Sequence, residues 1–113
     1  MTATTQAQYK TQARIIKALA HPTRLFIVDE LSRGERSVRE LTDMIGVEMP
    51  TVSRHLSQLR NVGIVDDEKR GVQVFYHLRV PCVLNFFKCV EAVRRGDGRR
   101  ARRKAGPEMC GAA

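Results

Sequence analysis

The feature that most constrains this 113-residue chain is a pair of short amphipathic segments joined by a tight turn. The segments Ser37–Ile45 and Pro50–Val62 carry apolar residues at helical spacing, and Gly46 begins the connection between them. Ser37 is followed three residues later by Glu40, which predicts a capping box at the start of the first helix. Two short helices joined by a glycine-containing turn predict a helix-turn-helix.

The remaining periodicities predict three more helices and one hairpin. Helical spacing indicates a first helix from Tyr9 to about Ala20 and a second from Pro22 to about Gly34, and Pro81 opens a last helix that runs to about Arg95. Apolar and polar residues alternate from Val72 to Leu78, which is typical of a strand, and we expect the hairpin turn at Arg70-Gly71. The predicted fold class is mainly α with a small β-hairpin, in the order α-α-α-α-β-β-α.

Length and charge predict one domain with flexible ends. We expect the domain at residues 9–95, preceded by a flexible N-terminus (1–8) and followed by a basic flexible tail (96–113). From Arg94 onward, seven basic and two acidic residues give the tail five of the eight net positive charges. The charge is compatible with an anionic partner such as DNA. The sequence shows no apolar run long enough for a bilayer and no signal-peptide pattern, so we expect a cytoplasmic protein without a membrane partner.

The second helix of the pair has two chemically different faces. Val52, Leu56 and Leu59 are predicted to pack inward. The residues predicted to point outward and contact DNA are Thr51, Ser53, Arg54, His55 and Gln58. Arginine can pair with guanine or hold phosphate, glutamine can pair with adenine, and hydroxyls can donate to phosphate or base edges.

The predicted hairpin adds two cations, Lys69 and Arg70, beside this helix. A basic hairpin tip next to a DNA-reading helix can reach flanking phosphate or the minor groove. Three acidic residues share the same hairpin, so its charge is mixed. The predicted partner is double-stranded operator DNA, and the alternative is an ordinary polar helix face.

Three blocks of the sequence resemble the ArsR/SmtB family of bacterial metal-sensing repressors. They are LAHPTRL at 19–25, VREL at 38–41 and PTVSRHLSQLRNVGIV at 50–65, and the resemblance extends over about residues 13–93. The resemblance implies a winged-helix homodimer that binds an operator near its own gene and is released by an inducer. Two common family sites are missing, because Glu40–Ile45 contains no cysteine and the last helix contains no histidine. The inducer therefore cannot be carried over from the family as a whole.

The three cysteines, Cys82, Cys89 and Cys110, suggest a different sensing site. In a cytoplasmic chain we expect them to be reduced. The segment Pro81–Val93 is apolar nearly all round, so we expect a homodimer in which the last helices pack together and the first helices extend the interface. Cys82 and Cys89 would stand about 10 Å apart along one helix, too far to share one ion. Antiparallel last helices would instead bring Cys82 of one chain level with Cys89 of its copy.

Thiolate ligands favour a thiophilic ion as the inducer. We predict As(III), held by Cys82, Cys89 and Cys110, with Sb(III), Cd, Pb and Hg as open alternatives and no other cofactor required. A second interpretation is a redox or sulfur-species sensor that forms a disulfide or polysulfide. A third is that the cysteines only pack at the interface. We do not expect an enzyme, because His21, His55 and His77 fall on separate predicted elements without catalytic spacing.

Overall fold

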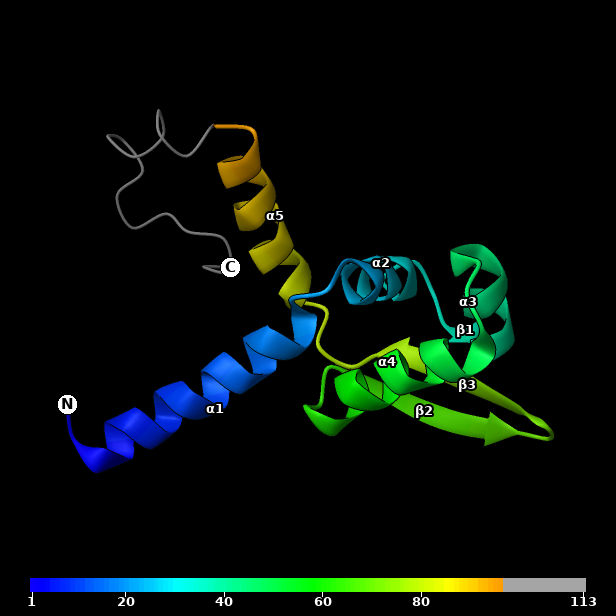
Figure 1. Ribbon diagram of the computed structural model, residues 1–113, viewed down its shortest axis with the longest axis horizontal. Helices are drawn as coiled ribbons and strands as arrows, with labels where there is room; N and C mark the ends of the chain where they lie inside the picture. The colour runs from blue at the N-terminus through cyan, green and yellow to red at the C-terminus, as the bar shows by residue number, and fades with distance from the viewer. Residues whose placement is uncertain (97–113) are drawn as a thin grey trace. The chain divides into compact units, whose positions relative to one another are not determined.

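The computed structural model of the chain describes residues 1–96 (Figure 1). Its elements are α1 (Ala3–Leu19), α2 (Pro22–Leu31), β1 (Arg36–Ser37), α3 (Val38–Ile45), α4 (Met49–Asn61), β2 (Val65–Arg70), β3 (Gln73–Leu78) and α5 (Val83–Arg94). They fall into two compact units, residues 1–80 and a second unit that begins at Pro81. Within residues 1–96, no helix is both long and apolar enough to cross a bilayer.

Helix α1 begins earlier than its apolar pattern predicts. The prediction placed residues 1–8 in a flexible segment, whereas the helix already begins at Ala3. The cause is a cap, because the Thr2 hydroxyl accepts a hydrogen bond from the Thr5 backbone N–H at 3.1 Å. Such a cap satisfies one of the N–H groups that a helix start leaves without a partner. Capping, and not core packing, therefore fixes this end of the helix.

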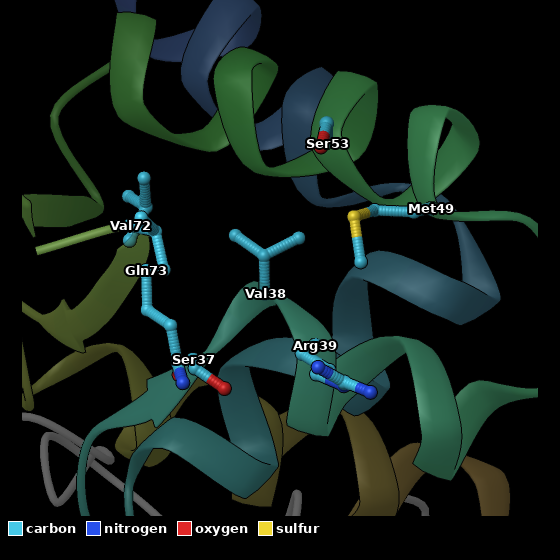
Figure 2. A pocket seen from close by; sticks show the side chains of 8 residues that line it. Ser37, Val38, Arg39, Met49, Ser53, Val72 and Gln73 are labelled. Atoms are coloured by element: carbon cyan, nitrogen blue, oxygen red, sulfur yellow. The ribbon is translucent and has the colours of Figure 1, made fainter.

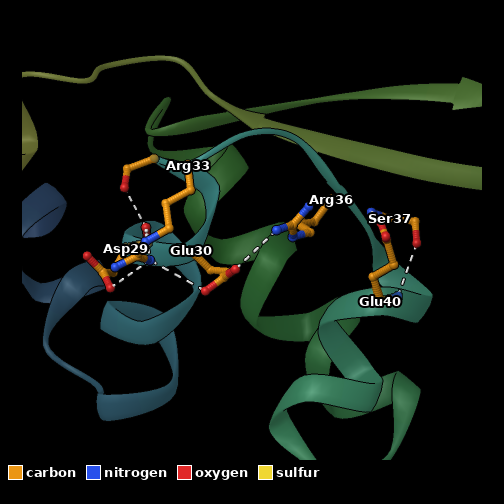
Figure 3. Close-up of polar contacts among 7 residues, drawn as sticks. Asp29, Glu30, Arg33, Arg36, Ser37 and Glu40 are labelled. Carbon is orange, nitrogen blue, oxygen red and sulfur yellow. Dashed lines mark hydrogen bonds and ion pairs between the residues drawn. The ribbon is translucent and has the colours of Figure 1, made fainter.

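Local signals set the start of α2 and both ends of α3 as predicted, whereas α2 ends at Leu31 and not near Gly34. Pro22 lies in the first turn of α2, and His21 caps that helix through Nδ1, which accepts from the Thr23 N–H at 3.1 Å. The capping box of α3 is confirmed (Figure 3): the Ser37 hydroxyl accepts from the Glu40 N–H at 3.0 Å, and the Glu40 carboxylate accepts from the Ser37 N–H at 2.8 Å. Gly46 ends α3 in the left-handed region at a φ of 83°.

The hairpin is part of a three-stranded antiparallel sheet of order β1-β3-β2. The β2–β3 hairpin is paired from Val65 opposite Leu78 to Arg70 opposite Gln73. The turn is Gly71-Val72, so the prediction that Val72 belongs to the strand is wrong, and its side chain is 97% exposed. Strand β1, which the sequence did not predict, places Arg36 opposite Tyr76.

The core of residues 1–80 lies among α2, α3, α4 and the sheet. Six apolar residues of this core are 0% exposed, and they are Ile27, Val28, Leu41, Val52, Leu56 and Leu59. The last three form the predicted inward face of α4. In α2, Ile27 occupies the core, whereas Leu25 is 40% exposed. With α3 and α4 followed by the projecting β2–β3 hairpin (Figure 1), the architecture is a winged helix-turn-helix, and β2–β3 is the wing.

Candidate nucleic-acid interface

Opposite its buried face, helix α4 has a polar face whose side chains have no partner among residues 1–96. Arg54 and Gln58 are exposed, and Thr51 and Ser53 are partly exposed, as predicted. None of these four side chains makes a hydrogen bond or ion pair with another part of residues 1–96. Because their donors and acceptors are not satisfied within the described chain, they are available to base edges and phosphates.

His55 does not belong to that face, so the prediction that it points outward is wrong. Its side chain is buried, and its Nδ1 accepts a hydrogen bond from the Arg24 Nε at 3.1 Å. Arg24 also donates to the Ala18 carbonyl at 3.1 Å, and the His21 ring centroid lies 4.5 Å from that of His55. Burial, with the nearby charges of His21, Arg24 and Arg54, lowers the pKa of His55. A neutral His55 therefore joins α4 to the junction between α1 and α2.

The two predicted wing cations, Lys69 and Arg70, differ in whether their charge is already paired within the protein. Lys69 is exposed, and within residues 1–96 it makes no ion pair. The Arg70 guanidinium donates to both carboxylate oxygens of Glu35, at 2.7 and 3.0 Å, and to Glu68 at 2.8 Å. It also lies over the Phe75 ring, 4.7 Å from the centroid. These hydrogen bonds raise the pKa of Arg70 and lower that of Glu35, so Arg70 must exchange carboxylates for phosphate before it can contact DNA.

Other arginines are also committed to the fold. Arg33 contacts Asp29 at 3.1 Å and Glu30 at 3.5 Å, and Arg36 contacts Glu30 at 3.3 Å (Figure 3). The Glu30 side chain thus connects the end of α2 to β1. The Arg33–Asp29 pair is exposed on both sides, where an ion pair contributes at most about 1 kcal/mol, whereas the Glu30 side chain is only 13% exposed. In both cases the pairing neutralises a cation.

A cavity of about 300 Å³ lies beside the polar face of α4 (Figure 2). Residues from α3, α4 and the wing line it, and they are Ser37, Val38, Arg39, Met49, Ser53, Val72, Gln73 and Val74. Of these residues only Ser53 was predicted from the sequence to contact DNA. The others come from three segments that lie ten or more residues apart, and no local pattern marks them as neighbours.

The predicted cysteine site is not assembled within residues 1–96. Cys82 is exposed, carries a free thiol and occupies the N-cap of α5. Cys89 is partly buried and does not carry a free thiol in the structure, which differs from the expectation of reduced cysteines. Cys110 lies outside the described residues. Among residues 1–96, no group of three or more His, Cys, Asp or Glu side chains could hold a metal ion.

Helix α5 is amphipathic only weakly and has no buried residue. Its exposed apolar side chains include Phe86, Val90 and Val93, which are 41%, 51% and 73% exposed. In the other unit, α1 likewise exposes Tyr9 and Ile16. Apolar residues exposed in series on a helix mark a surface that another chain can cover.

Comparisons with known proteins agree with this geometry. Residues 21–67 match the arsR family of bacterial regulatory proteins. The chain is 46% identical over 66 residues to the biofilm growth-associated repressor of Xylella fastidiosa (strain Temecula1), a match that covers 58% of each chain, less than two thirds of that repressor's length. It is 36% identical over 85 residues to a protein described as "Probable mercury resistance operon repressor" of Streptomyces lividans, covering 73% of this chain and 68% of that protein.

A solved structure shows the same fold over nearly the whole described chain. It is the solution structure of the homodimeric winged helix-turn-helix DNA-binding domain of Mb0332 from Mycobacterium bovis. The TM-score is 0.73 at 29% sequence identity, and the match covers 90% of this chain and 93% of that one. The similarity therefore includes the helix-turn-helix, the wing and the helices that flank them.

Proposed function

Because this chain belongs to the ArsR family of bacterial regulatory proteins, we propose that it is a transcriptional repressor that binds operator DNA. The observation that carries the proposal is the two-faced α4. One face is fully buried at Val52, Leu56 and Leu59, and the other presents side chains that no residue of 1–96 engages. In the proposed complex, α4 lies in the major groove, Thr51, Ser53, Arg54 and Gln58 contact bases and phosphates, and Lys69 on the wing contacts flanking DNA.

The repressor acts as a homodimer in this proposal. The exposed apolar side chains of α5 and α1 support it, because a second copy would remove them from water. The similar Mb0332 domain is itself described as homodimeric. Two copies of α4 would then meet half-sites one helical turn apart, about 34 Å along the duplex.

A binding experiment tests this part of the proposal. Selection from a randomised duplex library defines the preferred site, and fluorescence anisotropy compares that site with a scrambled duplex. We expect Arg54→Ala to lose about 1–3 kcal/mol of discrimination between the two duplexes. Arg33→Ala is the matched control, because Arg33 follows α2 and is paired with Asp29 of that helix, and it should leave discrimination unchanged. A monomer that prefers no duplex would contradict the proposal.

We further propose that a thiophilic inducer, As(III) first, releases the repressor from DNA. Cys82 and Cys89 lie about 10 Å apart along α5 and cannot share an ion within one chain. An ion would need sulfur from the second copy or from Cys110. The similarity to a protein described as a mercury resistance operon repressor supports a thiophilic ion.

The inducer is tested on fully reduced protein bound to labelled operator. Arsenite, antimonite, Cd²⁺, Pb²⁺ and Hg²⁺ are titrated separately, with wild type and with Cys82→Ser, Cys89→Ser and Cys110→Ser. We expect arsenite to release the wild-type protein from the operator. We expect Cys82→Ser and Cys89→Ser to stay bound to the operator when arsenite is added. Peroxide and polysulfide are titrated in parallel, because the exposed thiol of Cys82 is also accessible to oxidants. Release by these reagents but not by ions would favour the redox sensor, and unchanged release in all variants would leave the cysteines with a packing role.

A further inference from the structure

We propose that the cavity between α3, α4 and the wing seats one sugar-phosphate unit of the DNA backbone, with Arg39 as its phosphate ligand. The inference rests on the proposed DNA-binding function and adds a site to it. It concerns contacts that position the protein on the duplex, whereas the polar face of α4 reads bases.

The shape of the cavity favours a passing backbone over an enclosed small molecule. Its volume of about 300 Å³ is at the lower limit for ligand pockets, which range over about 300–1,000 Å³. Its rim is open, because Met49 and Val72 are 44% and 97% exposed. Figure 2 shows Val38 at the centre of the lining, with Met49 on one side and the wing residues Val72 and Gln73 on the other. A strand of DNA can therefore run between the start of α4 and the tip of the wing.

The chemistry of the lining matches a sugar and a phosphate. Val38, Met49 and Val74 offer apolar surface for the deoxyribose. Ser53 and Gln73 offer a hydroxyl and an amide that can donate to phosphate oxygens. The same Ser53 belongs to the outward face of α4, so the cavity adjoins the groups proposed to read bases.

Arg39 supplies the charge. It is exposed in the first turn of α3 and, within residues 1–96, makes no hydrogen bond or ion pair through its side chain. By contrast, Arg33, Arg36 and Arg70 are all paired with carboxylates. An unpaired guanidinium can take a phosphate without first releasing a protein carboxylate, and a charge-assisted bond of this kind is stronger than a neutral one.

The first test measures how binding depends on salt. A phosphate contact contributes about −0.9 to the slope of log K against log salt. Because the proposed repressor is a dimer with one Arg39 in each half-site, we expect Arg39→Ala to make that slope shallower by about two contacts and to weaken binding to the preferred and the scrambled duplex by the same factor. Arg39→Lys should keep the slope, and Arg33→Ala is the control for loss of an arginine elsewhere. Arg39 is exposed, so circular dichroism should show an unchanged fold in each variant.

The second test locates the phosphate. Neutral methylphosphonates replace single phosphates along each half-site of the preferred duplex. We expect one position per half-site at which the replacement weakens the wild type but no longer affects Arg39→Ala. If Arg39→Ala keeps the wild-type salt slope and the wild-type sensitivity to methylphosphonate at every position, the proposed phosphate site in the cavity is refuted. Specific DNA binding would still stand after that result. If the wild type itself prefers no duplex, the proposed function fails, and this inference fails with it.

Discussion

Replacing His55 tests whether its ring belongs to the fold or to the DNA interface. The ring is 8% exposed and accepts a hydrogen bond from Arg24 at 3.1 Å. In His55→Ala the Arg24 guanidinium loses its acceptor, which costs about 1.5 kcal/mol for a bond to a charged group, and the removed ring loses about 1–2 kcal/mol of burial. The free energy of unfolding should therefore fall by about 3 kcal/mol, or roughly 10–20 °C in Tm for a domain of this size.

His55→Asn is the matched variant for this experiment. An asparagine Oδ1 lies near the position of the histidine Nδ1, so the acceptor for Arg24 is retained and about half of the stability loss should be avoided. Urea and thermal unfolding are followed by circular dichroism at one fixed protein concentration, because the stability of a dimer depends on concentration. DNA binding is measured at a temperature at which both variants are folded. A His55→Ala protein that is as stable as wild type but fails to bind DNA would refute the structural role.

The same residue makes stability depend on pH. Burial keeps the folded-state pKa of His55 below its ordinary value of 6.5, with help from His21, Arg24 and Arg54. Above pH 6.5 the His55 ring is neutral in the folded and in the unfolded state, and its contribution to the free energy of unfolding is complete. As the pH falls through 6.5, the unfolded chain binds a proton that the folded protein excludes, so stability is lost until the folded-state pKa is reached. His55→Asn should show less of this loss as the pH falls below 6.5. Parallel curves for the two proteins would exclude His55 as the cause.

Three further changes probe the cap, the core and the wing. Ser37→Ala should lower the free energy of unfolding by about 1 kcal/mol, measured by urea unfolding, because it removes one half of the α3 capping box. Leu56→Ala should cost about 2–5 kcal/mol in the same assay, because Leu56 is fully buried. Replacing both Glu35 and Glu68 with Gln should remove the two carboxylate partners of Arg70 and steepen the salt dependence of DNA binding by up to about one phosphate contact per half-site, and an unchanged slope would show that Arg70 does not contact DNA.

The parts of the fold that the sequence predicts are those with local signals. The Ser37/Glu40 capping box, Pro22 in the first turn of α2 and Gly46 after α3 are each defined by a few adjacent residues. The inward face of α4 also follows from spacing along one helix. Such features depend little on distant parts of the chain, because helix periodicity and capping act within one or two turns.

The misplaced residues depend on contacts between distant segments. Strand β1 is only two residues long, too short to show alternation, and exists because Arg36 and Ser37 pair with β3. His55 lies three residues after Val52 and four before Leu59, at the helical spacing of the buried face, but its polar side chain led to the wrong prediction that it points outward. Its partner Arg24 lies 31 residues earlier, so the sequence alone did not reveal that the ring could be satisfied inside.

The candidate interface shows why formal charge is a poor guide to a DNA-binding surface. Arg70, which the sequence singled out, is neutralised by Glu35 and Glu68, whereas Arg39, which it did not, is unpaired beside the cavity. A paired arginine that turns to phosphate exchanges one surface ion pair for another and gains little from the contact itself. An unpaired one releases a DNA counterion without losing a carboxylate. Arg39 and Arg54 should therefore determine DNA affinity more than Arg70 does. The test measures the affinity of the three alanine variants at one salt concentration. If Arg70→Ala binds DNA most weakly of the three, this conclusion is wrong.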